Sequence, residues 1–188
     1  HIQLKRELSS LGYVFSTGSD TEVVFWALVA WGETALAKFD GMFALAFYNA
    51  LSRSLVLARD RFGEKPLYYD VTDGLAIFSS ELRSLLGILN RVPEVSVDGI
   101  NCFLMHGFFS NSFTAIEGVK KVEPGQFVIV DCDGKVSVET YFRYLDLLIR
   151  EKSLVNSSWQ NMEEEFDDVW KCVITEMSQV DAALGQYL

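Results

Sequence analysis

The run Arg59-Asp60-Arg61-Phe62-Gly63-Glu64-Lys65-Pro66-Leu67-Tyr68-Tyr69 is a dense series of charged and turn-forming residues set between apolar segments. Residues 42–48 and 54–58 precede it, and neither segment alternates apolar with polar side chains. Such segments are typical of strands that are covered on both faces. Residues 49–53 between them are too few for a crossover helix, so the two strands are predicted to pair antiparallel. An antiparallel sheet covered on both faces predicts an α+β sandwich, with a second sheet on one side and helices on the other.

A helix is predicted to begin at Ser19-Asp20-Thr21-Glu22. A serine followed three residues later by a glutamate is the pattern of a capping box, in which each side chain accepts from the other residue's backbone N–H. Residues 23–31, which follow, are apolar nearly all round. The helix is therefore predicted to be buried.

The other predicted elements are short. Gly12 is expected to end a first helix over residues 2–11. Asp133-Gly134 is typical of a two-residue hairpin, and Pro124-Gly125 is typical of a turn. The remaining expected helices are 33–38, 81–86 and 97–107, and the remaining expected strands are 13–15, 75–81, 116–122, 126–130 and 136–141.

Composition limits the classes of protein to which the chain can belong. The 188 residues carry a net charge of -10, and the basic residues form no stripe. This argues against binding to nucleic acid or to an anionic membrane. The longest uninterrupted apolar run, residues 23–31, is too short to span a bilayer. The length suffices for one domain of ordinary size and part of a second.

Cysteine and histidine are scarce. Cys102, Cys132 and Cys172 are far apart, odd in number and form no CxxC pair, which is typical of reduced thiols in a cytosol. Cys102 lies in an apolar helix and is predicted to be buried and unreactive, and the other two cysteines are interpreted in the same way. His1 and His106 are the only histidines, so no metal site is predicted.

Three motifs together resemble a known family. Asp40-Gly41-Met42-Phe43-Ala44, the run over residues 59–69, and Phe78-Ser79-Ser80-Glu81 follow one another with short gaps. In this order they resemble the glutaminase domain of glutamine-hydrolysing asparagine synthetases, a class II glutamine amidotransferase of the N-terminal nucleophile type. The resemblance covers residues 1–142 well and the rest loosely. It implies a four-layer α/β/β/α sandwich of antiparallel sheets.

The resemblance also implies a catalytic apparatus of which this chain holds a part. In the family the nucleophile is a cysteine at the mature N-terminus, and its own α-amino group acts as base. That cysteine, and an Asn-Gly-Glu segment that stabilises the oxyanion, are expected upstream of His1, so the chain is expected to be a fragment that is inactive alone. The family places the Asp of a Ser-Asp-x-Glu segment against the α-ammonium of glutamine. This assigns glutamine binding to Asp20, with Ser19 and Gly18 beside it, whereas the residues alone indicate a helix cap at Ser19 and Asp20.

The C-terminal part is expected to begin a second domain. Residues 143–160 are predicted to be a linker, because apolar periodicity fades and polar residues cluster there. Ser157 or Ser158 is expected to cap a final helix, whose apolar residues between 166 and 177 fall on one stripe. Residues 180–188 have the pattern of a buried strand.

The resemblance implies the reaction of a larger enzyme. Glutamine hydrolysis would supply ammonia, and ATP with Mg²⁺ would activate aspartate as an acyl-adenylate, from which ammonia displaces AMP to give asparagine. Residues 161–188 would begin the synthetase domain, and Leu188 would border the ATP site just before a Ser-Gly-Gly-Leu-Asp-Ser pyrophosphate loop. Glutamine, aspartate and ATP are thus the expected partners, the cytoplasm is the expected location, and the family allows a homodimer.

Two other functions stay open at this point. A relative with the same two domains acts on another carboxylate, as in β-lactam or peptide-cyclising synthetases. A glutaminase-like module that only binds a partner or senses an amino acid belongs to a different class. The residue at the native N-terminus separates that class from the enzymes, because only the enzymes need a cysteine there.

The charges of the opening run invite a catalytic interpretation. We instead predict that Arg59, Asp60 and Arg61 are structural and fix the loop between strands by ion pairs and backbone hydrogen bonds. Gly63 and Pro66 are expected to set the path of that loop.

Overall fold

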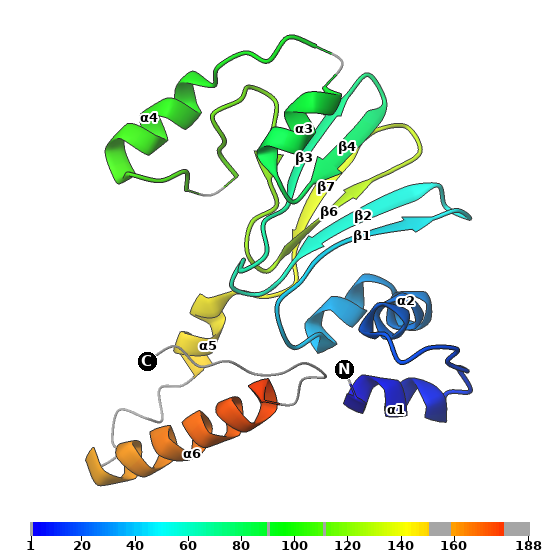
Figure 1. The fold of residues 1–188 in the computed structure, drawn as a ribbon, viewed down its shortest axis with the longest axis vertical. Helices are drawn as coiled ribbons and strands as arrows, with labels where there is room; N and C mark the ends of the chain where they lie inside the picture. The colour runs from blue at the N-terminus through cyan, green and yellow to red at the C-terminus, as the bar shows by residue number, and fades with distance from the viewer. Residues whose placement is uncertain (1, 90, 111, 151–158, 179–188) are drawn as a thin grey trace. The chain divides into compact units, whose positions relative to one another are not determined.

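The larger of two antiparallel sheets contains the predicted hairpin. The computed structural model describes residues 2–89, 91–110, 112–150 and 159–178. Within them, four strands pair antiparallel in the order β1-β2-β6-β7 (Figure 1). The bounds of these strands are β1 (Ala44–Asn49), β2 (Ser54–Arg59), β6 (Gln126–Val130) and β7 (Val136–Thr140). The antiparallel pairing of the first two strands is confirmed.

The smaller sheet has the order β4-β3-β5 and is also antiparallel. Its strands are β3 (Tyr68–Thr72), β4 (Leu75–Ser79) and β5 (Lys120–Lys121). The prediction of a strand over residues 116–122 was therefore wrong in its extent. The Thr114 hydroxyl lies within hydrogen-bond distance of the carbonyls of Ile116 and Val119, and Gly118 has a φ of 81°, so this part of the chain turns before β5 begins.

Three helical segments precede the sheets along the chain. They are α1 (Ile2–Ser10), α2 (Asp20–Trp31) and the 3-10 helix η1 (Gly32–Lys38). α2 is not buried all round, as its apolar sequence had suggested, because Phe25 is 47% exposed while Val23, Ala27 and Leu28 are buried. No strand forms at residues 13–15, where the chain is irregular and the Tyr13 ring packs beside Trp26.

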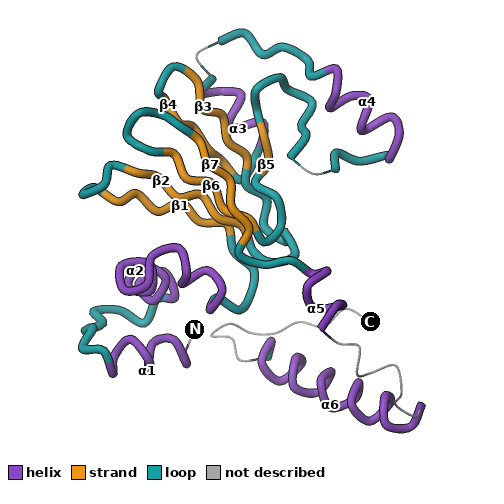
Figure 2. Tube along the Cα trace, turned by 180° about the vertical axis from the view of Figure 1, so that it is seen from behind, coloured by secondary structure: helices purple, strands orange, loops and turns teal. Residues whose placement is uncertain are grey.

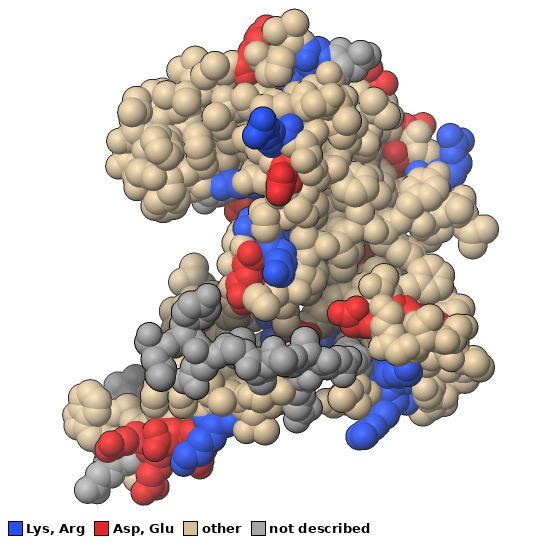
Figure 3. Space-filling view, viewed as in Figure 1, with Lys and Arg blue, Asp and Glu red and all other residues tan. Residues whose placement is uncertain are grey.

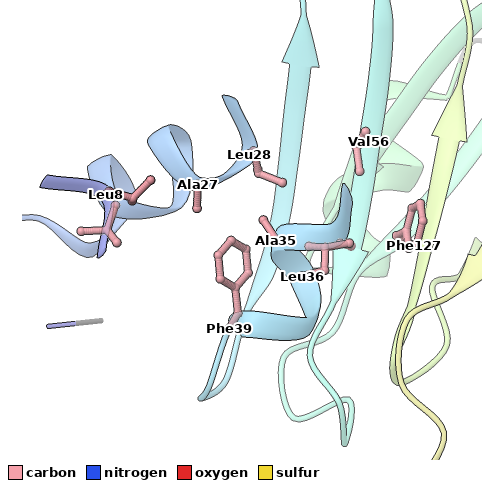
Figure 4. Packing of buried hydrophobic residues seen from close by; sticks show 10 residues of the cluster. Leu8, Ala27, Leu28, Ala35, Leu36, Phe39, Val56 and Phe127 are labelled. Carbon is pink, nitrogen blue, oxygen red and sulfur yellow. The ribbon is translucent and has the colours of Figure 1, made fainter. Parts of the chain in front are cut away.

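Helices cover one face of the larger sheet, and the smaller sheet covers the other. Val56 and Phe127 point into a buried cluster with residues of α1, α2 and η1 (Figure 4). On the opposite face, Leu57 and Val128 pack with Tyr69 of β3. Full burial of a side chain such as Leu57 contributes roughly 1.5–3 kcal/mol. α3 (Leu82–Ile88) packs on β3 and β4 as a fourth layer, which confirms the α+β sandwich (Figures 1 and 2).

β1 is covered less completely than its sequence predicts. It lies at the edge of the larger sheet. On the face toward the smaller sheet, only Ala44 of β1 packs against the cluster that contains Leu57 and Val128. Ala46 and Tyr48 on the same face are exposed. β2, by contrast, has buried residues on both faces. The expectation of two-sided burial is thus right for β2 and right for one face of β1.

α4 (Val97–His106) begins at Val97 and ends at Gly107, as predicted, and Ser96 caps its start. Cys102 on its inner side is buried, which is confirmed, whereas Cys132 and Cys172 are exposed, so the prediction of buried thiols was wrong for these two. The outer side of α4 carries exposed apolar residues such as Leu104 and Met105. Few charged residues are visible over this part of the surface (Figure 3).

Two turns of the larger sheet can be compared with expectation. Gln126 N–H donates to the Glu123 carbonyl at 3.1 Å across Pro124-Gly125, so that turn is confirmed. The loop between β6 and β7 is longer than the two residues predicted. Asp131 and Lys135 close it, because the side chain of Asp131 accepts from the backbone N–H of Lys135 at 2.9 Å.

The chain divides into two compact units after Arg143. The second unit contains α5 (Tyr144–Arg150) and α6 (Trp159–Met177). The predicted linker over 143–160 therefore includes a helix, while the final amphipathic helix is confirmed. Its apolar stripe is exposed within this unit and comprises Phe166, Val169, Trp170, Val173 and Ile174. The predicted caps Ser157 and Ser158, the strand over 180–188 and Leu188 lie outside the described residues.

No helix in the described part of the chain is long and apolar enough to cross a membrane. No group of three or more His, Cys, Asp or Glu side chains in it could hold a metal ion.

Candidate functional site

A cavity of about 640 Å³ lies in the first unit, with α2 and the β1 segment among its walls. It contacts consecutive residues 42–47, whose side chains alternate between the two faces of the strand. A cavity that touches all of them must lie along the edge of β1, and β1 is the edge strand of its sheet. The described lining comprises Asp20, Thr21, Val24, Phe25, Leu28, Met42, Phe43, Ala44, Leu45, Ala46, Phe47, Lys65, Pro66 and Ser80.

The three motifs that carried the family resemblance meet at this cavity, together with the Ser-Asp-x-Glu segment at the start of α2. Asp20 comes from the Ser-Asp-x-Glu segment, and Phe43 from the Asp-Gly-Met-Phe-Ala segment. Lys65 and Pro66 come from the run over residues 59–69, and Ser80 comes from the Phe-Ser-Ser-Glu segment. Stretches as far apart in sequence as residues 20 and 80 therefore share one concave surface, which is typical of a ligand site.

Ser19, rather than Asp20, caps α2. The Ser19 hydroxyl accepts from the backbone N–H of Thr21 at 3.2 Å. The predicted capping box is wrong, because the Ser19 hydroxyl accepts from Thr21 and not from Glu22, and Glu22 does not reach back to Ser19. Its carboxylate instead accepts from the backbone N–H groups of Ser16 and Thr17, at 2.8 and 2.7 Å. The Ser16 N–H above all, with further hydrogen bonds from Thr17, lowers the pKa of Glu22 to about 2.

The Asp20 carboxylate is therefore not used as the cap. Asp20 is the first residue of α2 and is exposed, and its carboxylate contacts the hydroxyl of Thr21 at 3.5 Å. A carboxylate in the first turn of a helix is favoured by the helix dipole. Gly18 lines a different hollow, together with Ile2, Lys5, Arg6 and Ser9. Of the three predicted residues, the structure brings only Asp20 to the wall of the cavity, and its role toward glutamine stays a prediction.

Arg59 and Asp60 fix the loop that carries Lys65 by backbone hydrogen bonds, as predicted. Arg61 instead donates to the Ala37 carbonyl at 3.0 Å and pairs with Asp40 at 3.7 Å. Asp60 is 1% exposed, and its carboxylate accepts from the backbone N–H groups of Phe62, Glu64 and Lys65 at 3.0 to 3.1 Å. Burial alone would raise the pKa of Asp60, but these N–H groups outweigh it and the pKa is lowered. Arg59 holds the other side of the loop by donating to the carbonyls of Lys65, Val122 and Gly63. Its own pKa is lowered by burial.

Several residues that line the cavity were not predicted as site residues. Lys65 is the one cation of the described lining, and Ser80 adds a hydroxyl. Both belong to the quoted motifs, so their place in those motifs was the available signal. Phe25 and Leu28 gave no such signal, because an apolar residue of a helix has the same pattern whether it faces a core or a cavity.

Thiol chemistry is not found at this cavity. None of the described cysteines is in its lining, and Cys102 is held elsewhere, where its sulfur lies 3.0 Å from the Ser110 hydroxyl. The cavity, as far as it is described, therefore offers charges of both signs and hydroxyl groups on a largely apolar wall. Such a surface suits binding and orientation of a small polar molecule.

Residues 1–142 match the glutamine amidotransferase domain family. This chain belongs to that family. The match ends within one residue of the boundary between the two compact units. The amidotransferase region therefore coincides with the α/β/β/α sandwich that holds the cavity.

Relatives with known names agree with the family. The chain is 37% identical over 143 residues to asparagine synthetase [glutamine-hydrolyzing] 1 of Bacillus subtilis, and the match covers 76% of this chain and 22% of that protein. A putative asparagine synthetase of Mycobacterium bovis is 27% identical over 192 residues, which covers 100% of the chain and 29% of the relative. The chain thus spans less than a third of these relatives.

A solved structure supports the fold. The glutamine phosphoribosylpyrophosphate amidotransferase of Bacillus subtilis, complexed with ADP and GMP, superposes with a TM-score of 0.51 at 20% identity. The match covers 75% of this chain and 26% of that one. The resemblance to the class II glutamine amidotransferase region of asparagine synthetases, proposed from the motifs, is confirmed by the family match and by the named relatives.

Proposed function

We propose that the cavity beside β1 binds glutamine, and that this chain supplies the glutaminase region of a glutamine-hydrolysing asparagine synthetase. The observation that carries the proposal is the Asp20 carboxylate, which lines the cavity while Ser19 caps the helix. A carboxylate released from capping can pair with the α-ammonium of an amino acid, and such charge-assisted hydrogen bonds are the stronger ones.

The lining suits an amino acid at its other groups as well. Lys65 offers a positive charge, and Ser80 and Thr21 offer hydroxyl groups that can meet a carboxylate or an amide. The apolar residues, Val24, Leu28 and others, can pack against the methylene groups of the side chain. One negative and one positive charge in the same cavity match a zwitterion better than they match a singly charged ligand.

The nucleophile is proposed to come from a cysteine at the native N-terminus, with its α-amino group as base. Because the described lining contains no cysteine, residues 1–188 alone are expected to bind glutamine but to release no ammonia from it. Released ammonia would then serve the ATP-dependent amidation of aspartate through an acyl-adenylate in a second domain.

We further propose that the C-terminal part of the chain belongs to this second domain. Residues 161–188 would begin it, after the linker at 143–160, and Leu188 would border the ATP site. ATP and Mg²⁺ supply the activation of aspartate when bound. Among the described residues, no group of three or more His, Cys, Asp or Glu side chains could hold the Mg²⁺. A cytoplasmic homodimer remains the proposed setting.

The test compares L-glutamine with glutaramate, which has the same carboxylate and amide but lacks the α-amino group. Calorimetric titration of the wild-type chain is expected to give tighter binding of glutamine than of glutaramate. In Asp20→Asn this preference should vanish, because the variant removes the partner of the ammonium. Equal binding of the two ligands to the wild type would overturn the proposal, as would a preference that survives in the variant.

A further inference from the structure

Asp60 connects two walls of the cavity although it does not line it. Its backbone N–H donates to the carbonyl of Phe43 at 2.9 Å, just before β1 begins. Its side chain accepts from the N–H of Lys65 at 3.0 Å. Phe43 and Lys65 both line the cavity, whereas Asp60 is 1% exposed. One buried residue thus bonds to the β1 wall and to the Lys65–Pro66 wall at once.

The surrounding contacts leave this connection little freedom. Arg59 donates to the Lys65 carbonyl at 2.7 Å, so both peptide groups of Lys65 are held. Gly63 has a φ of 69°, and a Cβ there would lie 2.7 Å from Pro124 and 2.9 Å from Arg59. Pro66 then restricts the residue before it. The Asp60 carboxylate and its partly buried hydrogen bonds, with Arg59, thus fix the backbone position of one cavity residue, Lys65.

We infer that Asp60 is a positioning residue for glutamine: it sets the distance between the Phe43 wall and the Lys65 wall, and so the fit of the ligand. The inference rests on the proposed function, because glutamine is the ligand whose fit is at stake. Asp60 itself touches neither the cavity nor the ligand. A carboxylate is suited to positioning this loop, because it accepts hydrogen bonds from the three backbone N–H groups and carries no proton of its own.

The experiment separates positioning from stability by a matched control. Asp60→Asn replaces one acceptor oxygen by an N–H₂ group, which cannot accept from the loop. Tyr141→Phe serves as control. The Tyr141 hydroxyl donates to the Arg59 carbonyl at 2.7 Å and so belongs to the same cluster of hydrogen bonds, but Tyr141 is absent from the described cavity lining. Binding of L-glutamine to the chain is measured by calorimetry, and melting temperatures are recorded for all variants. Arg59→Lys, which keeps the charge but cannot hold three carbonyls, replaces Asp60→Asn if that variant does not fold.

The expected result is a rise in Kd of about tenfold to a hundredfold in Asp60→Asn, the scale on which small displacements act in a site. Tyr141→Phe should lower the melting temperature and leave Kd within about twofold, well below the tenfold step that 1.4 kcal/mol represents. Unchanged glutamine affinity in Asp60→Asn would overturn the inference. So would equal losses of affinity in the two variants at equal melting temperature.

Hydrogen exchange gives a readout that does not depend on glutamine. Asp60→Asn is expected to speed amide exchange at both walls, residues 43–47 and 62–65. Tyr141→Phe is expected to leave the exchange rates of residues 43–47 unchanged. Exchange that rises only at 62–65 would refute a link between the walls. Absence of glutamine binding to the wild type, with the exchange pattern as expected, would instead overturn the proposed function and leave the link between the walls established.

Discussion

The hydroxyl of Ser19 accepts a hydrogen bond from the backbone N–H of Thr21 at 3.2 Å, and this bond leaves the neighbouring Asp20 carboxylate available for another purpose. The two residues are adjacent in sequence and both are common at helix starts. Their tasks nevertheless differ, because only Asp20 lines the cavity. The division of labour between Ser19 and Asp20 is therefore the structural basis for assigning Asp20 to a ligand.

Ser19→Ala removes the cap of α2 and is expected to lower the free energy of unfolding by about 1 kcal/mol. Urea denaturation of the chain measures this loss. Asp20→Asn serves as the comparison, and its expected loss is smaller because the cap hydroxyl remains. A larger destabilisation by Asp20→Asn than by Ser19→Ala would show that Asp20 is the true cap.

Glu22→Gln tests the loop before α2 through its dependence on pH. Hydrogen bonds from Ser16 and Thr17 lower the pKa of Glu22 from 4.5 to about 2 in the folded protein. A lowered folded pKa means that the ionised side chain stabilises the protein above about pH 4.5, and that this contribution is lost as pH falls toward 2. The variant should be less stable than wild type at pH 7, and the difference should shrink at pH 3. A difference independent of pH would contradict the assignment.

Two helical glycines are expected to respond oppositely to alanine. A Cβ at Gly99 of α4 would overlap the carbonyl oxygen of Thr114, so Gly99→Ala should destabilise the chain by about 1–3 kcal/mol. Gly87 of α3 has open space around it, and Gly87→Ala should stabilise by about 0.4–1 kcal/mol. Thermal unfolding of both variants checks the pair, and a stabilising Gly99→Ala would mean that α4 is not packed against Thr114.

The fold could be predicted where local chemistry decides it. Residues 42–48 and 54–58 are apolar without alternation and joined by a short link, which leaves an antiparallel hairpin as the one simple solution. The sequence pattern gave the wrong extent for a strand where side chains bond to backbone groups that the strand was expected to use. β5 is short because the chain turns before it, where the Thr114 hydroxyl lies at hydrogen-bond distance from the carbonyls of Ile116 and Val119.

The candidate site shows the same limit. Asp20 was assigned to the site through the family resemblance, because its local sequence alone indicates only the start of a helix. Lys65 was not predicted, because its place in the cavity depends on the buried Asp60 carboxylate and on the Arg59 side chain across the loop. Those contacts follow from the tertiary fold, which brings Phe43 and Lys65 to the same residue. The sequence near Phe43 or Lys65 does not show that both residues bond to Asp60.

The most direct test of the glutamine site is the kinetics of Asp20→Asn in the proposed enzyme that contains this chain. Loss of a charge-assisted hydrogen bond, roughly 1.5–3 kcal/mol, should lower kcat/KM for glutamine by about one to two orders of magnitude. Asparagine formation from free ammonia should stay nearly unchanged, because ammonia does not need the glutamine cavity. Intact glutamine kinetics in Asp20→Asn, or an equal loss with ammonia as the nitrogen source, would contradict the account.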